Sequence, residues 1–341
     1  MHNLFITPTE AADIIEAGSI ALFAGSEEAL AALPPGRWIG GTTAYFMTDH
    51  GGVVDAERLF CTVITDATEA RISSFAPGEM DGLAAGQYRN GFTYVIMPAF
   101  SAAHQDYAMR ASGFAGLDAQ PIIGWVSGVQ VKDFGLRQPK VFHGPTGRAF
   151  ENALLAMHVA LPDDLSAQLH MINPFTQGTG PTIVFPETGF SARECLVDGK
   201  LMRVADYLAT CDTRLPLVAD YAGTMINVSL RSMDAATGEA QFYAPVVAGE
   251  PYRVARALPE DYRGAFGNDA AVNGAPDAVL SCNCVLNFLY CGLEGQSTGG
   301  FIGPVTFGEI AYILVNQTLV GLSLSRIADP AAAPGCALSD R

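Results

Sequence analysis

Residues 20–43 read IALFAGSEEALAALPPGRWIGGTT and place a helix signal between two short apolar runs. The first run, 20–24, has the length of a buried strand. Ser26 followed by two glutamates is typical of a helix N-terminus, and the proline pair that begins at Pro34 ends the helix. Trp38 begins the second apolar run. The order strand, helix, strand is typical of the α/β class, so we predict that fold class for the chain.

Local signals on both sides of this stretch extend the same pattern. Thr7 and Glu10 flank a proline at the first helical position, which predicts a helix there, and Ser101 is expected to cap a helix over 102–111. We expect strands at 60–64, 92–97, 121–131, 141–143 and 315–324, and the spacing of Phe150, Leu154, Met157 and Leu161 predicts a helix after the loop 144–148. These elements predict mixed β-sheets with helices packed on their outer faces.

The length of 341 residues suggests two lobes. Glycine and proline are concentrated over 178–189, which marks a join near residue 180. We therefore expect an N-terminal lobe at 1–180, a C-terminal lobe at 181–328 and a flexible tail at 329–341.

Composition narrows the classes of function. Lys and Arg number 19 against 35 Asp and Glu, a formal net charge of −16, which disfavours nucleic acid as a partner. Apolar residues make up 49% of the chain, yet no apolar run is long enough to span a membrane and the N-terminus does not resemble a signal peptide. We expect a cytoplasmic protein with a small-molecule ligand and no membrane partner, and its seven cysteines are expected to be reduced.

Two segments near the C-terminus resemble a known family. They are Gly299-Gly300-Phe301-Ile302-Gly303-Pro304-Val305-Thr306-Phe307-Gly308-Glu309-Ile310 and Asn316-Gln317-Thr318-Leu319, which are similar to the closing segments of the FIST family. The resemblance covers roughly residues 195–326, and Trp38 to Thr43 is similar to a turn in the family's N-terminal part. It implies that the two lobes are FIST N-like and FIST C-like.

The resemblance also implies a function. FIST domains are sensory or small-ligand-binding modules, with amino acids or haem as ligands, so it implies a stand-alone sensor. The chain carries no kinase, cyclase or receptor segment, and any signal would pass to a signalling protein partner in trans.

Three cysteines form the densest set of soft ligands: Cys282, Cys284 and Cys291. Thiolates favour zinc, cuprous copper or an iron–sulfur cluster, although the spacing lacks the paired CxxC of common zinc sites and buried cysteine is also an ordinary core residue. Cys282 and Cys284 share one face of a strand. Either of them could instead be a catalytic nucleophile with Glu309 or His143 as its base.

The remaining candidates are polar residues within apolar or glycine-rich stretches. Glu309 could bind an ammonium group or act as a general base, or it could accept backbone N–H bonds in a tight turn or cap Asn316-Gln317-Thr318. Asn316 and Thr318 would share one face of a strand and bind a ligand or a neighbouring loop. Thr42 and Thr43 could form a nest of backbone donors, and Arg148 could bind an anion at the start of the helix predicted after it.

The expected site combines these residues in a cleft between the lobes, with Cys282, Cys284, Glu309, Asn316 and Thr318 facing Thr42, Thr43 and Arg148. Histidine adds little: we expect His158 in the core, and His50 and His104 at the surface, although any of them could ligate haem.

Overall fold

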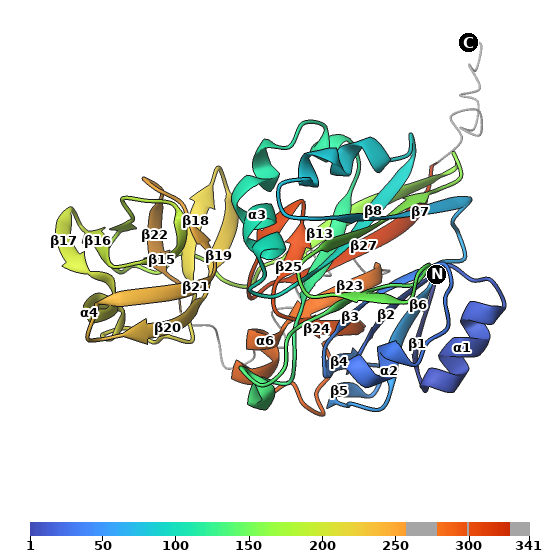
Figure 1. Cartoon of the computed structure of the whole chain (residues 1–341). Coiled ribbons are helices and arrows are strands. Elements are labelled where there is room, and N and C mark those ends of the chain that lie inside the picture. The colour runs from blue at the N-terminus through green and yellow to red at the C-terminus, as the bar shows by residue number, and fades with distance from the viewer. Residues whose placement is uncertain (257–277, 299, 328–341) are drawn as a thin grey trace, which may run out of the picture.

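The computed structural model describes residues 1–256, 278–298 and 300–327 (Figure 1). It is a mixed α/β structure dominated by strands, and the described strands form five sheets. Three sheets use residues up to 172 and from 278 onward, which we call the main body. The other two sheets use residues 183–254, which we call the small unit and which lies at the left of Figure 1.

The first sheet of the main body contains the stretch 20–43. Its strands, in spatial order, are β1 (His2–Ile6), β6 (Leu59–Val63), β2 (Ala21–Gly25), β3 (Trp38–Thr42), β10 (Val141–His143) and β11 (Arg148–Phe150). Strands β2 and β3 are parallel and α2 (Glu27–Ala31) connects them, as predicted. Helix α1 (Pro8–Glu16) begins with the predicted capping box. Both helices cover a core that contains Ile15, Leu30 and Trp38.

Two further sheets complete the main body. The second is β26 (Ile313–Val315), β25 (Glu309–Ala311), β9 (Ile122–Ser127), β8 (Gly91–Pro98), β12 (Leu154–Ala160) and β7 (Glu69–Phe75). The third is β13 (Leu165–Ile172), β27 (Leu319–Arg326), β23 (Ala278–Cys284), β24 (Gly303–Thr306), β4 (Tyr45–Thr48) and β5 (Gly51–Val54). All three sheets contribute side chains to one hydrophobic core.

Short helices accompany these sheets. Helix α3 (Ala102–Arg110) is capped by Ser101 as predicted, and α6 (Val285–Tyr290) follows β23 directly. Four 3-10 helices are η1 (Met80–Gly86), η2 (Ala111–Gly113), η3 (Leu117–Ala119) and η4 (Val131–Asp133). No helix in the described ranges is long and apolar enough to cross a bilayer.

The small unit has its own core, which contains Phe185, Phe242 and Tyr252. Its larger sheet is β17 (Lys200–Arg203), β16 (Glu194–Val197), β14 (Ile183–Val184), β22 (Pro251–Val254), β18 (Leu217–Tyr221) and β19 (Thr224–Val228). Its smaller sheet is β15 (Gly189–Ala192), β21 (Glu239–Val246) and β20 (Leu230–Asp234), and α4 (Val204–Leu208) packs beside them.

Gly40 and Gly41 belong to strand β3, and Gly41 allows close packing between two sheets. A Cβ at Gly41 would lie 2.7 Å from Ile96 and 2.8 Å from Trp125, both in the second sheet. Glycine therefore allows the first two sheets to approach each other closely.

The predicted helix that includes Phe150 and Leu161 is wrong. Residues 154–160 form strand β12, which pairs with β7 on one side and β8 on the other. All seven residues of β12 are buried and six of them are apolar, so the run lacks the alternation of apolar and polar residues that would mark a strand. The helical spacing of its apolar residues is a coincidence.

Two other expectations differ from the structure. The predicted strand 315–324 is interrupted, because β26 ends at Val315 and β27 begins at Leu319, with Gln317 at φ +49° between them. The sheets also do not follow the expected division at residue 180, since β13 pairs with β27 along its whole length. The predicted tail at 329–341 lies outside the described residues.

Candidate functional site

Three of the predicted site residues form a buried polar cluster with Thr306. We call Cys284, Thr306, Glu309 and Thr318 the Glu309 cluster; each is at most 2% exposed. Cys284 and Thr306 end the parallel strands β23 and β24 at paired positions, and Glu309 begins β25. One carboxylate oxygen, Oε1, accepts from the Thr306 hydroxyl at 3.2 Å. The other, Oε2, accepts from the backbone N–H and the hydroxyl of Thr318 at 3.2 and 2.9 Å.

Burial dominates the electrostatics of this cluster. It raises the pKa of Glu309 to about 8, although hydrogen bonds from Thr318, Thr306 and the Cys284 thiol act in the opposite direction. Burial, followed by the nearby Glu309 charge, raises the pKa of the Cys284 thiol well above its ordinary value. A nucleophilic cysteine needs a lowered pKa, so this environment favours a structural role for Cys284.

The residues next to the cluster are also buried and polar. Asn287 on α6 donates to Asn283 Oδ1 at 2.9 Å and to the Thr318 carbonyl at 3.3 Å. One amide atom of each of Asn283, Asn287 and Asn316 has no hydrogen-bond partner. The predicted role of Asn316 on a strand face is wrong, because it lies in the turn that ends β26.

The turn at 316–318 connects the main body to the small unit through hydrogen bonds. Asn227 of β19 donates to the Asn316 carbonyl at 3.1 Å. The Gln317 side chain accepts from the Ser229 hydroxyl at 2.7 Å and donates to the Arg214 carbonyl at 3.1 Å. Within the segment 316–318, Thr318 therefore bonds to Glu309 of the main body. Asn316 and Gln317 bond to the small unit.

The three cysteines have different surroundings. The Cys282 thiol donates to the Gly124 carbonyl at 3.4 Å, and burial, followed by the nearby charges of Glu309 and Cys284, raises its pKa well above the ordinary value. Cys284 donates to Glu309, and Cys291, which follows α6, packs against the core cluster that contains Cys284. Within the described ranges, no group of three or more Cys, His, Asp or Glu side chains is placed to hold a metal ion.

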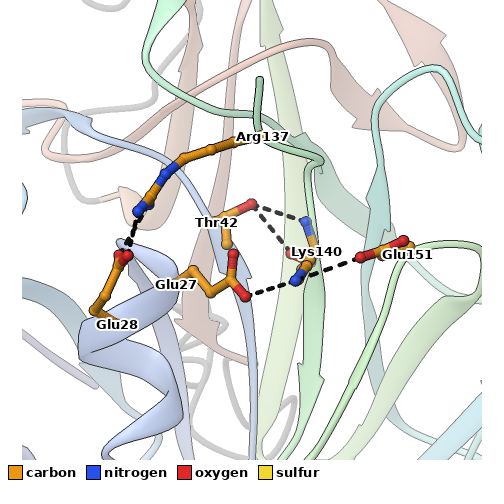
Figure 2. Close-up of polar contacts among 6 residues, drawn as sticks. All are labelled: Glu27, Glu28, Thr42, Arg137, Lys140 and Glu151. Carbon is orange, nitrogen blue, oxygen red and sulfur yellow. Dashed lines mark hydrogen bonds and ion pairs between the residues drawn. The ribbon is translucent and has the colours of Figure 1, made fainter. Parts of the chain in front are cut away.

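Thr42 ends β3 and Thr43 follows it, and both line a cavity of about 70 Å³. Thr42 Oγ1 accepts from the Lys140 backbone N–H at 2.9 Å, and the Thr43 hydroxyl donates to the Val305 carbonyl at 2.7 Å. Figure 2 shows Lys140 between Glu27 and Glu151, and Arg137 paired with Glu28. The two threonines thus make structural hydrogen bonds, and the cations beside them are already paired.

The anion site predicted at Arg148 is wrong. Residues 144–147 form the turn of the hairpin between β10 and β11, so no helix N-terminus follows. Arg148 is exposed on the edge strand β11, with its guanidinium 4.9 Å from the Phe150 ring centroid.

A separate cavity lies at the junction between the small unit and the main body. It has a volume of about 220 Å³ and we call it the His104 cavity. Its lining residues are Phe100, His104 and Gln105 from the main body and Phe190, Ser191, Arg231, Gln241 and Phe242 from the small unit. Helix α3 supplies His104 and Gln105, and Figure 1 shows this helix next to the small unit.

His104 is the buried polar group of this cavity. It is 2% exposed, so the expectation of a surface histidine is wrong. Its Nδ1 accepts from the Phe100 backbone N–H at 3.2 Å, which places the ring proton on Nε2 in the neutral form. Burial, followed by the charge of Arg231, lowers the pKa of His104 to about 4. In the described part of the chain Nε2 has no hydrogen-bond partner, and a buried unpaired donor costs about 1–3 kcal/mol.

Phe100 adds backbone strain at the same place. Its φ of +61° is unfavourable for a bulky side chain and typical of residues at functional sites. The Phe100 ring contacts the rings of Phe134 and Tyr243 as well as that of His104.

A larger apolar cavity borders the same helix. It has a volume of about 500 Å³ and lies between α3, β26 and the small unit. Ala108 and Ser112, which follow His104 at four-residue intervals, line it together with Tyr221, Tyr252 and Leu314. One side of α3 therefore borders both cavities at the junction.

The His104 cavity could not be predicted from the sequence. Its lining comes from residues 100–105, 190–191, 231 and 241–242, which only the tertiary fold brings together. In the sequence, Arg231 is a signal of this cavity, but it lies in an exposed strand. Exposed arginines are too common for one of them to identify a binding site.

The comparisons with known proteins place the chain in a family. A family model described as a family of unknown function, DUF6976, matches residues 6–325, so the chain belongs to that family. Neither a curated protein nor a solved structure matches the chain.

Proposed function

We propose that this member of the DUF6976 family is a small-molecule-binding protein that holds its ligand at the junction between the small unit and the main body. The observation that carries this proposal is the His104 cavity, where a buried donor, the Nε2–H of His104, has no partner among the residues that the structure describes. A ligand acceptor would satisfy that donor and recover the free energy lost by burying it.

The size of the cavity supports a ligand as small as an amino acid. Pockets for drug-sized molecules usually span about 300–1,000 Å³, and the His104 cavity has about 220 Å³. An amino acid is one of the two ligands that the FIST resemblance implies. The other ligand that the resemblance implies, haem, stays a prediction that this cavity does not support.

A sensory role fits the position of the cavity. A ligand here would contact α3 and the small unit together, so it would favour one arrangement of the two parts over others. This preference is the physical requirement for passing a signal to a partner protein.

Native mass spectrometry tests the proposal. We expect freshly purified protein to retain an extra mass that is lost on denaturation, or to gain mass and thermal stability with an amino acid or small organic acid. Gln105→Trp fills the cavity from α3 and should abolish binding. Met109→Trp is the matched control, because Met109 is exposed on the same helix and does not line the cavity.

Two results would contradict the proposal. One is the absence of any bound mass together with no stabilisation by a panel of the twenty amino acids and common organic acids. The other is equal binding by the wild type and Gln105→Trp.

A further inference from the structure

The charged group of the His104 cavity is Arg231, which is exposed and forms no ion pair with any described carboxylate. Seven of the described arginines form ion pairs and seven, Arg231 among them, do not, so what distinguishes Arg231 is its place at the cavity. Its guanidinium carbon lies 3.9 Å from the Phe100 ring centroid. The Phe100 ring thus positions the cation without neutralising it.

The pairing of the strands around Arg231 is irregular, and such irregularities change the direction in which side chains point. In the pairing of β20 with β21, Leu230 lies opposite Phe242 and Ser232 opposite Gln241, so Arg231 is an extra residue at a β-bulge. In the pairing of β15 with β21, the register shifts between Gly189 and Ser191, which places Phe190 at a second irregularity. Bulges re-aim side chains and are frequent beside active sites. Both irregular residues line the His104 cavity.

The charge of the cavity matches a monoanion. Arg231 contributes one positive charge, and His104 is neutral near pH 7 because burial lowers its pKa to about 4. A carboxylate has one negative charge and a planar pair of oxygens that fits a guanidinium. A phosphate dianion would leave a negative charge uncompensated in a mostly apolar cavity.

We infer that the His104 cavity binds a small carboxylic acid as its anion, with an apolar or aromatic body. The carboxylate accepts from the Arg231 guanidinium and from the His104 Nε2–H, and the body packs against Phe100, Phe190 and Phe242. The inference rests on the proposed function and adds the chemical class of the ligand.

Isothermal titration with matched acids and amides tests this inference. The probes are benzoate and phenylacetate, each compared with its neutral primary amide, together with phenylalanine and leucine as amino-acid probes. We expect at least one acid to bind, and its amide to bind at least about 10-fold more weakly, because the amide cannot pair with the Arg231 charge. Arg231→Gln should lower the affinity for that acid by about 10-fold or more and leave the affinity for the amide unchanged. Arg193→Gln is the matched control, since Arg193 belongs to the small unit, pairs with Glu239 and does not line the cavity.

The outcomes separate this inference from the proposed function. If an acid and its amide bind equally well, or Arg231→Gln does not weaken the acid, the carboxylate assignment is wrong while binding at the junction stands. If no acid in the set binds, the assignment is wrong, and the native mass measurement with Gln105→Trp decides on the junction separately.

Discussion

The Glu309 cluster and the His104 cavity both bury polar side chains, but they leave them in opposite states. Both oxygens of Glu309 accept hydrogen bonds from groups of the main body. In the cavity, by contrast, the buried His104 Nε2 has no hydrogen-bond partner among the described residues, and the exposed Arg231 beside it forms no ion pair with a described carboxylate. A satisfied buried network stabilises one fold, whereas unsatisfied groups around an opening lower stability and favour a ligand. Burial of polar residues alone therefore does not identify a binding site.

The largest effect that we expect concerns the charge of Glu309. Its pKa is about 8 in the folded protein and close to 4.5 in the unfolded chain, so the unfolded chain releases the proton first as the pH rises. The stability associated with the neutral carboxyl is complete below pH 4.5 and is lost as the pH rises toward 8, by on the order of 4 kcal/mol. Urea unfolding of the wild type and Glu309→Gln between pH 5 and 8.5 measures this, and the variant should lose much less stability over that range. Parallel curves for the two proteins would show that Glu309 is already ionised when buried.

The second effect is the loss of one hydrogen bond in the cluster. Thr318→Val removes the hydroxyl that donates to Glu309 and keeps the shape of the side chain. We expect the free energy of unfolding to fall by about 1–3 kcal/mol at pH 7, with ligand affinity at the junction unchanged. An affinity that falls in proportion to stability would contradict the separation of the two regions.

The third effect concerns the pH dependence that His104 sets. His104→Phe removes the unpaired Nε2 donor but also the Nδ1 acceptor of the Phe100 N–H, so the two contributions oppose each other and stability at pH 7 should change by less than about 1 kcal/mol while ligand affinity falls. The pKa of His104 is about 4 in the folded protein and close to 6.5 in the unfolded chain, so the wild type loses stability as the pH falls below about 6.5. The stability of the variant relative to the wild type should therefore rise between pH 7 and pH 5. Thermal and urea unfolding measure it, and a relative stability that is the same at both pH values would show that burial does not hold His104 neutral.

The smallest effect should come from the ion pairs in Figure 2. Arg137→Gln breaks the exposed pair with Glu28, and such pairs are worth about 0–1 kcal/mol. Stability should change within that range and shrink further in 0.5 M salt, without an effect on binding at the junction. A large loss would show that the loop holding Arg137 supports more of the main body than its contacts indicate.

Features that depend only on residues close together in the sequence were predicted correctly. Thr7, Ser26 and Ser101 each cap a helix where predicted, because a capping side chain bonds to a backbone group two or three positions later. Strand β12 was mistaken for a helix because burial on both faces removes the alternation of apolar and polar residues.

The candidate site was predicted only in part, for a related reason. Glu309 and Thr318 are nine residues apart, at the start and just beyond the end of the hairpin of β25 and β26, so their association follows from a local pattern. That His104 and Arg231 line one cavity depends on how α3 packs against β21, the neighbour of β20, which no local pattern encodes. The resemblance to the FIST family stays a prediction.

The third sheet has a consequence for the synthesis of the protein. Strand β4 pairs with β24, and the Thr43 hydroxyl bonds to a carbonyl 262 positions later in the chain. The hairpin of β4 and β5 therefore emerges from the ribosome long before its partner exists, with one edge unpaired. Unpaired edges are templates for association between chains, so the nascent protein needs protection until translation is nearly complete. Premature termination before residue 303 would leave that edge permanently open.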